Sequence, residues 1–331
     1  RREAVMIHVA FAGTFAASLE PRVRTHLGMP AEITRADEAA IVSTLPGVDV
    51  LVSMAFTREM GAAAGRLRLV QVPGAGLDRI DRAALPPGAR LANAYGHETG
   101  IAEFVLGAML ALTRGLPRLD AALRRGTWES QWAVGPPPPA PWPELAGTTA
   151  GILGYGRIGR CVARRARAFD MDVLAIRRDA GRSAGDEFAR VGGPEMLGEV
   201  LRRADYLVIT LPLTPQTRGL IGQAQLQALK RTAVLVNVSR AEIVDEPALY
   251  HALAEGRLAG AALDVWYRYP TSDTPTLPGH EPFHELPNVL MTPHVSGWTE
   301  GMLEARAKLI AENIHRAARG EPPVNEIAPV A

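Results

Sequence analysis

The stretch TTAGILGYGRIGR, residues 148–160, carries three glycines, Gly154, Gly156 and Gly159, in the spacing G-x-G-x-x-G. An apolar run precedes the first glycine and a helix-compatible segment follows the last, which is the context that gives this spacing a mechanism. There the first glycine makes a tight turn, the second admits a diphosphate close to the backbone, and the third lets the helix pack on the strand. The stretch therefore predicts a dinucleotide-binding strand–turn–helix unit.

The residues after the glycines bear on which dinucleotide binds. The backbone amides near Arg157 and Ile158 would meet the diphosphate at the positive end of the helix. About twenty residues on, an NAD-binding unit usually has a carboxylate that binds the ribose 2′-hydroxyl. This chain has Arg177 and Arg178 there, with Asp179 two residues late. Because guanidinium groups suit a 2′-phosphate, the sequence favours NADP, with NAD as the alternative.

Short apolar runs alternate with helix-length segments on both sides of this unit, and the proline-rich loop 135–143 separates two such series. Continuously apolar strands separated by helices indicate parallel sheets covered on both faces. The sequence thus predicts an α/β fold with two doubly wound parallel-sheet domains. Besides the run before the glycines, strands are expected at 5–11, 48–54, 66–72, 89–93, 173–176, 206–210, 233–238, 260–265 and 289–292, and helices at 31–42, 57–65, 99–113, 157–169, 195–203, 223–230, 246–256 and 299–319.

Composition narrows the class of protein. A chain of 331 residues can form two domains, and a net charge of +1 gives no electrostatic case for nucleic acid or an anionic membrane. The single cysteine, Cys161, excludes an intrachain disulfide and fits a reducing compartment. Glu3 and His8 interrupt the first apolar run, which favours a strand over a secretory signal. We expect a cytoplasmic protein.

Polar side chains follow the expected strands of the second series. Carboxyl ends of parallel strands share one edge of a sheet, where doubly wound folds bind their ligands. Any one of these residues alone is more readily explained as a solvated surface group. The convergence of the whole set on one edge beside a dinucleotide loop is hard to attribute to chance and indicates a functional site there; the set is Thr210, Thr217, Ser239, Arg240, Asp264 and His294.

Several of these segments together resemble the D-2-hydroxyacid dehydrogenase family: ELAGTTAGILGYGRIG, LPLTPQTRGLI, VNVSRAEIVDEPAL, GRLAGAALDV and LPNVLMTPHVSGWT. The resemblance implies a Rossmann cofactor domain, residues 99–298 with the linking helix and the proline-rich loop, inserted in a flavodoxin-like substrate domain, residues 1–98 plus 299–331. It also implies a homodimer, with Trp128, Trp132 and Trp142 either at the dimer contact or packed on their own domain.

The resemblance also assigns roles to single residues. Arg240 would bind the substrate carboxylate and polarise the reacting carbonyl, and His294 would exchange a proton with its oxygen while facing the nicotinamide. QVPGAGLDRID, residues 71–81, resembles the substrate loop of the family. The carboxylate would be held by the amides of Ala75 and Gly76, the nicotinamide carboxamide by Asp264, Val238 and Ser239, and the adenosine side by Leu211, Pro212 and Thr217. No metal ligands are predicted.

The chain departs from the family pattern in LDVWYRYP, residues 263–270, where Tyr269 occupies the position of the usual glutamate beside the catalytic histidine. A carboxylate there raises the imidazole pKa, and a neutral phenol does not. Tyr269 is expected to orient the ring through its hydroxyl. Glu98, at the start of the linking helix, is the alternative source of a carboxylate, although it is more readily explained as a helix-start residue.

The predicted function is the NAD(P)-dependent interconversion of a 2-keto acid and a D-2-hydroxy acid. Two alternatives remain open from the sequence. An oxidoreductase acting on a phosphonate or phosphite would use the same cationic clamp, and a dinucleotide-sensing protein without turnover would explain the lost glutamate.

Overall fold

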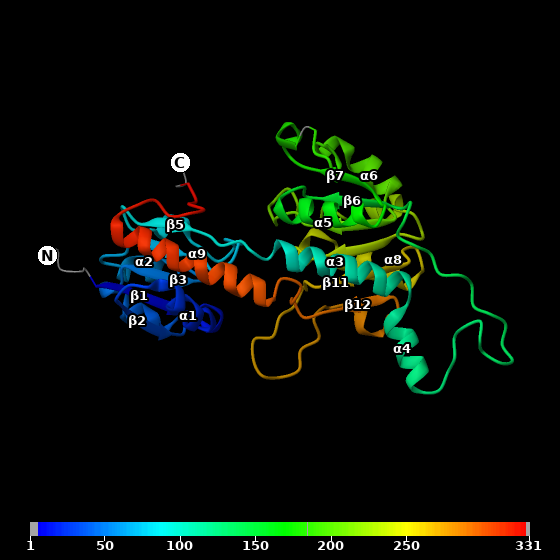
Figure 1. The fold of residues 1–331 in the computed structure, drawn as a ribbon, viewed down its shortest axis with the longest axis horizontal. Coiled ribbons are helices and arrows are strands. Elements are labelled where there is room, and N and C mark those ends of the chain that lie inside the picture. The colour runs from blue at the N-terminus through cyan, green and yellow to red at the C-terminus, as the bar shows by residue number, and fades with distance from the viewer. Residues whose placement is uncertain (1–5, 184, 329–331) are drawn as a thin grey trace. The chain divides into compact units, whose positions relative to one another are not determined.

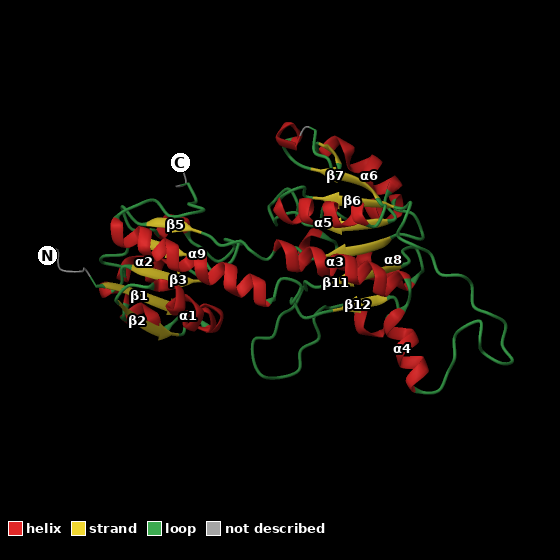
Figure 2. Ribbon diagram, in the orientation of Figure 1, coloured by secondary structure: helices red, strands yellow, loops and turns green. Residues whose placement is uncertain are grey.

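The computed structural model describes residues 6–183 and 185–328 and divides into two compact units. One unit is Arg1–His97 with Trp298–Ala331, and the other is Glu98–Gly297 (Figures 1 and 2). These limits lie one residue from the divisions expected from the sequence. Which unit binds substrate and which binds cofactor stays a prediction.

The first unit contains a five-stranded parallel sheet with the order β2-β1-β3-β4-β5, which is the flavodoxin-like order. The strands are β1 (Ile7–Ala12), β2 (Ala31–Ala36), β3 (Val50–Ser53), β4 (Leu69–Gln71) and β5 (Arg90–Ala92). The helix expected at 31–42 is wrong, because Ala31 to Ala36 pair with β1 from Ile7 to Ala12. Pairing with a central strand overrides the helix propensity of this alanine-rich stretch.

Three helices cover this sheet: α1 (Thr14–Leu27), α2 (Arg58–Ala63) and α9 (Glu300–Arg319). The buried side chains of α9 recur at helical spacing, with Ala307, Ile310, Ala311 and Ile314 in one core with residues of α1 and β1. The last helix of the chain therefore returns to the first unit, as expected, and lies beside α1 (Figure 1).

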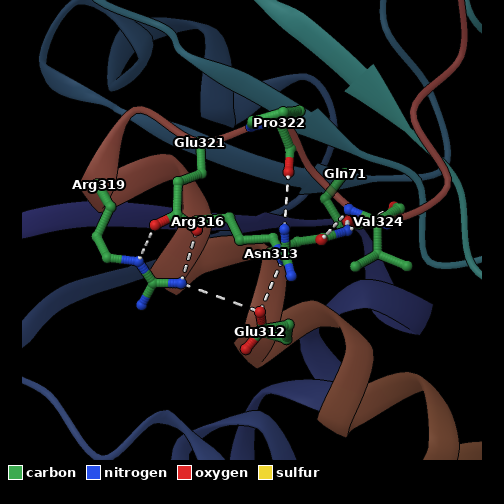
Figure 3. A network of polar contacts seen from close by, with 8 residues as sticks. All are labelled: Gln71, Glu312, Asn313, Arg316, Arg319, Glu321, Pro322 and Val324. Carbon is green, nitrogen blue, oxygen red and sulfur yellow. Dashed lines mark hydrogen bonds and ion pairs between the residues drawn. The ribbon is translucent and has the colours of Figure 1, made fainter.

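A buried polar network ties the segment after α9 to the same sheet (Figure 3). Asn313 Nδ2 donates to Gln71 Oε1 at 2.6 Å and to the Val324 carbonyl at 3.1 Å, and Val324 N–H donates to Asn313 Oδ1 at 2.7 Å. Further along, Ile327 N–H donates to the Leu91 carbonyl at 2.8 Å and Glu326 bridges antiparallel to Ala92. The segment thus pairs with the free edge of β5.

The second unit contains a seven-stranded parallel sheet with the order β12-β11-β10-β9-β6-β7-β8. The order reverses between β6 and β9, as in a dinucleotide-binding sheet. The strands are β6 (Thr149–Leu153), β7 (Asp172–Ile176), β8 (Arg190–Gly192), β9 (Tyr206–Ile209), β10 (Val234–Asn237), β11 (Gly260–Leu263) and β12 (Val289–Met291). The prediction of two doubly wound α/β domains is confirmed.

Two apolar cores lie on the two faces of this sheet, one under α3 and α5 and the other under α6, α7 and α8. The helices of the unit are α3 (Glu98–Thr113), α4 (Leu116–Arg124), α5 (Arg157–Ala168), α6 (Leu197–Arg203), α7 (Gln223–Ala228) and α8 (Glu246–Ala254). Among the described residues no single helix has the length and apolarity to cross a membrane; α3 and α4 meet that test only as a pair bent by 57°.

Candidate active site

The glycine turn between β6 and α5 has the geometry that a dinucleotide requires. Gly154 has φ 106°, and a Cβ there would lie 2.7 Å from the Leu211 nitrogen. A Cβ on Gly159 would lie 2.4 Å from the Gly154 carbonyl oxygen, so only glycine lets α5 approach the turn. Beside Gly156, in contrast, the described residues leave open space, and this glycine caps α5 without a side chain. That space at a helix N-terminus fits a diphosphate.

The segment after β7 presents guanidinium groups where the ribose would lie. Arg177 directly follows the strand and donates to Ser183 Oγ at 2.8 Å, and Arg178 is exposed. The nearby carboxylate of Asp186 is already engaged, because it accepts from Tyr155 Oη at 2.7 Å and from Arg160 Nε at 2.8 Å. Partial burial opposes it, but these bonds keep the pKa of Asp186 below its usual value. Asp186 was not singled out from the sequence.

The ends of β9 and β10 are tied to each other and to the glycine turn. Thr210 Oγ1 donates to the Gly154 carbonyl at 2.7 Å, and Ser239 Oγ donates to the Leu211 carbonyl. The Asn237 side chain accepts from Ser239 N–H at 3.1 Å and donates to the Arg240 carbonyl at 3.0 Å. Asn237 is buried and fixes the turn that carries Arg240, a role that sequence reasoning missed.

The loop after β9 places the three residues predicted for the adenosine side. Leu211 and Thr217 are half-buried and Pro212 is exposed. The Thr217 hydroxyl donates to the Pro212 carbonyl at 2.7 Å and accepts from Thr214 N–H at 2.8 Å. Thr217 thus stabilises this loop from within, and its contact with a nucleotide stays a prediction.

Tyr269 and His294 lie side by side at the same edge of the sheet. Tyr269 Oη is 2.8 Å from His294 Nδ1, and the ring centroids are 5.8 Å apart. Trp266 N–H donates to the same hydroxyl at 3.4 Å. The phenol is therefore within hydrogen-bonding distance of Nδ1, and the Glu98 carboxylate lies 3.9 Å from the Arg157 guanidinium.

The charges around these two rings set their pKa values. Loss of solvent around the His294 ring lowers its pKa, the Arg240 guanidinium lowers it further, and the Asp264 carboxylate opposes both. Burial raises the pKa of Tyr269, while the Trp266 N–H and the Arg240 charge act against that rise. Arg240 thus acts on both rings, which places the three predicted catalytic side chains in one cluster. Near neutral pH the phenol is uncharged and the imidazole is largely neutral.

The loop that carries His294 is held by Asp264 at the end of β11. Asp264 is fully buried, and its carboxylate accepts from the Thr292 hydroxyl at 2.7 Å and from the Val295 and Ser296 N–H groups at 2.8 Å each. His294 itself has φ 58°, a left-handed conformation that costs about 1–2 kcal/mol for a residue with a Cβ. The three bonds to Asp264 over-determine this conformation.

The aromatic cluster after β11 supports that loop. Trp266 is buried and its indole N–H donates to the Thr292 carbonyl at 2.8 Å, one more bond to the His294 loop. Tyr267 stacks on Phe283 with an interplanar angle of 10° and donates to the Val244 carbonyl at 2.9 Å. Trp266 and Tyr267 therefore pack against the loops that carry the site, and of the three rings in this cluster Tyr269 is the one that contacts His294.

In the first unit, Ala75 and Gly76 lie in the loop after β4, at the carboxyl edge of the sheet. Both residues are half-buried. Within the described part of the chain, neither of their N–H groups has an acceptor. Two adjacent unpaired backbone donors suit a carboxylate.

Comparison with known proteins identifies the family. A family model described as "D-isomer specific 2-hydroxyacid dehydrogenase, NAD binding domain" matches residues 106–296. The chain belongs to the D-isomer-specific 2-hydroxyacid dehydrogenase family. The predictions of this family and of a nicotinamide-dependent oxidoreductase acting on CH–OH donors are thereby confirmed.

Individual relatives agree with this placement. The chain is 36% identical over 290 residues to D-3-phosphoglycerate dehydrogenase of Methanocaldococcus jannaschii; the match covers 85% of this chain and 52% of that protein, so the chain spans about half its length. It is 36% identical to glyoxylate reductase of Korarchaeum cryptofilum, covering 86% and 84% of the two chains. The structure of NADPH-dependent glyoxylate/hydroxypyruvate reductase from Sinorhizobium meliloti, in complex with NADP and sulfate, matches with a TM-score of 0.79 and 26% identity over 98% and 99% of the chains.

Proposed function

We propose that the protein reduces a 2-keto acid to the D-2-hydroxy acid, or catalyses the reverse oxidation, with a nicotinamide dinucleotide. The observation that carries this proposal is the cluster of Arg240, His294 and Tyr269 at the sheet edge that also holds the glycine turn. The bound nicotinamide would supply or accept the hydride at C2. The residues of the chain would bind the acid and move the proton.

Arg240 and His294 provide complementary chemistry for that reaction. Reduction builds negative charge on the keto oxygen, which a guanidinium stabilises. The imidazole then gives a proton to the same oxygen, and in the oxidation it takes the proton back. The amides of Ala75 and Gly76 would hold the substrate carboxylate, and Asp264 would keep the imidazole in place through the loop it binds.

Tyr269 would orient the imidazole without charging it. Its oxygen accepts the Trp266 N–H and lies 2.8 Å from Nδ1 of His294. A phenol oxygen has two lone pairs, so it can also accept the Nδ1 hydrogen of the neutral ring, and that tautomer would leave Nε2 free to exchange the proton with the substrate. A family member with glutamate at this position would instead favour the charged ring.

NADP is our proposed cofactor in preference to NAD. Arg177 and Arg178 follow β7 directly, and the Asp186 carboxylate is taken up by Tyr155 and Arg160. A 2′-phosphate would meet guanidinium groups there, whereas the first carboxylate after the strand, Asp179, comes two residues later than the position that usually binds a 2′-hydroxyl.

A homodimer is the proposed assembly. Large apolar side chains are exposed along α4 and the segment that follows it, at Leu116, Leu123, Trp128, Trp132 and Val134, with exposures from 51% to 99%. We define these five residues as the apolar arm. Several large exposed apolar side chains along one segment are typical of a protein–protein contact.

Turnover of the purified chain tests the proposed reaction. We expect the absorbance of NADPH to fall faster than that of NADH with glyoxylate, hydroxypyruvate or a larger 2-keto acid. The His294→Asn variant is the matched control, because asparagine tolerates the left-handed backbone but cannot transfer the proton. Oxidation of phosphite would favour the phosphite alternative, and dinucleotide binding without turnover on any acid would favour the sensor.

A further inference from the structure

Two hydrogen bonds join the substrate loop of the first unit to the segment after β5. The Ala94 N–H donates to the Gly74 carbonyl at 3.0 Å, and the Asn93 side-chain amide donates to the Ala75 carbonyl at 3.0 Å. Asn93 is 3% exposed, and its backbone N–H is bonded in turn to the Asn325 carbonyl at 3.4 Å. The loop is thus held through two successive carbonyl groups.

The planarity of the peptide turns these two bonds into control of two donors. In a trans peptide the C=O of one residue and the N–H of the next point in opposite directions. Holding the Gly74 carbonyl toward Ala94 therefore directs the Ala75 N–H away from that segment. Holding the Ala75 carbonyl toward Asn93 does the same for the Gly76 N–H. Both unpaired donors are then fixed on the opposite side of the loop.

The hydrogen-bond balance of Asn93 indicates that its amide group is needed as a donor. A carbonyl only accepts, so it must be the Nδ2 of Asn93 that faces Ala75, and the same Nδ2 also donates to the Tyr95 hydroxyl at 3.4 Å. Its Oδ1 is buried, and among the described residues it has no hydrogen-bond partner. An unpaired buried acceptor destabilises a fold by about 1–3 kcal/mol. Leucine would fill similar space without that penalty, yet it could not hold the Ala75 carbonyl.

We infer that Asn93 is a positioning residue for substrate binding: by holding the Ala75 carbonyl it aims the Gly76 N–H at the carboxylate of the acid. The inference rests on the proposed function, since it assigns the carboxylate of a 2-keto acid to this loop. Asn93 does not touch the reacting atoms. Its effect is therefore on the affinity for the acid and not on the chemical step or on the cofactor.

Kinetics of Asn93→Ala and Asn93→Leu test this role. With glyoxylate and NADPH we expect KM to rise about tenfold in both variants, because one orienting hydrogen bond is lost, while kcat changes less than about twofold. The Kd of NADPH should stay unchanged. Asn93→Leu also removes the unpaired acceptor, so it should fold at least as stably as the wild type and keep the test valid if Asn93→Ala unfolds.

The control is Glu20→Ala, a fully buried polar side chain of the same unit whose bonds run to Arg24 and Arg35 and do not reach the segment that contacts Asn93. It should lose stability without raising KM. Binding of oxamate to the enzyme–NADPH complex, measured by calorimetry, gives a readout that does not depend on turnover and should weaken by the same factor in the Asn93 variants.

The outcomes separate the two proposals. A wild type that neither turns over 2-keto acids nor binds oxamate contradicts the proposed function and, with it, the role of Asn93. An active wild type whose KM and oxamate affinity survive both Asn93 substitutions contradicts the role of Asn93 alone. A rise in KM that appears equally in Glu20→Ala also contradicts it, since that result would show a general effect of destabilising the unit.

Discussion

His294 has a backbone conformation that residues with side chains rarely adopt, and its imidazole pKa is lowered instead of raised. The bonds to Asp264 hold the backbone conformation, whereas burial of the ring and then the charge of Arg240 lower the pKa. The side chain beside Nδ1 is the phenol of Tyr269, and the Asp264 carboxylate accepts from backbone and hydroxyl donors of the loop. The group that would orient the His294 ring, the neutral phenol of Tyr269, is therefore different from the groups that set its pKa.

The Tyr269→Glu variant tests this separation. Reduction requires the protonated imidazole, so the rate of the wild type should fall as the pH rises through a value below about 6.5, the ordinary pKa of histidine. A glutamate beside Nδ1 would favour imidazolium, and the fall should move to higher pH by about one unit or more. Oxidation, which needs the neutral ring, should shift in the same direction. The measurement is kcat/KM against pH in both directions.

Tyr269→Phe is the matched control, because it keeps the ring and removes only the hydroxyl. It should lower kcat through a poorly oriented imidazole without moving the pH profile upward. Identical profiles for wild type and Tyr269→Glu would remove Tyr269 from the mechanism.

The strand ends and the family resemblance together singled out Arg240, His294 and Tyr269 as candidates, because each lies in a turn that follows a recognisable strand. It was not sufficient for Asn93, Asn237 or Asp186. Asn93 and Asp186 matter through partners elsewhere in the chain, Ala75 for Asn93 and Tyr155 for Asp186. Asn237 matters through the geometry of a local turn, which cannot be deduced from the sequence alone. Buried polar contacts depend on tertiary packing, which a single sequence does not specify residue by residue.

The strand–turn–helix formed by β6, the glycine turn and α5 contains two glycines, Gly156 and Gly159, that are expected to be needed for different reasons. Gly159 is required by the protein itself, since any side chain there would collide with the Gly154 carbonyl. Gly156 faces open space and has φ −96°, a conformation that alanine adopts without strain. The need for glycine at this second position would come from the ligand alone.

Two alanine substitutions distinguish these needs. Gly156→Ala should leave the free energy of unfolding of the cofactor-free protein within about 0.5 kcal/mol of wild type and weaken NADPH binding at least tenfold. Gly159→Ala should lose both stability and binding, with a destabilisation of about 1–3 kcal/mol from the forced displacement of α5. Urea denaturation and fluorescence titration measure the two quantities. Undiminished NADPH binding by Gly156→Ala would show that the diphosphate does not lie on this turn.

Most helices and strands were predictable from apolar periodicity, and the exceptions have physical causes. The stretch AEITRA reads as a helix because of its alanines, but it forms β2 through pairing with β1. The three-residue strand β8 carries too few apolar positions to stand out and exists through its pairing with β7. Short edge strands depend on a neighbour for their hydrogen bonds, so their own residues carry little of the signal.

Taken as a whole, the molecule combines two sheets whose strand orders differ, 2-1-3-4-5 in one and a reversal between β6 and β9 in the other. The alternation of strands and helices predicted two parallel sheets, and the family resemblance predicted their topologies. The return of α9 to the first unit was also expected, since it follows the last strand of the second sheet. The sequence could not predict whether the apolar arm is covered, because exposure depends on what packs around it.

The apolar arm should hold two copies of the chain together. Replacing Trp128 and Trp132, which are 59% and 76% exposed, with glutamate would place two charges in the contact. We expect the wild type to elute as a dimer and the double variant as a folded monomer, with masses determined by light scattering. Leu277→Glu, an equally exposed apolar position on another loop of the same unit, is the control and should stay dimeric. A monomeric wild type would contradict the proposed assembly.

The pairing of the segment around Glu326 with β5 has a consequence for solubility. An unprotected strand edge is a template on which other chains can add strands and aggregate. Here that edge is occupied by the protein's own Ile327 and by the Arg90–Glu326 ion pair at 2.7 Å. A protease that cut after α9 would uncover this edge and also release the partner of Asn93. A single cut in the first unit, outside the unit that carries His294, would then remove both solubility and binding of the acid.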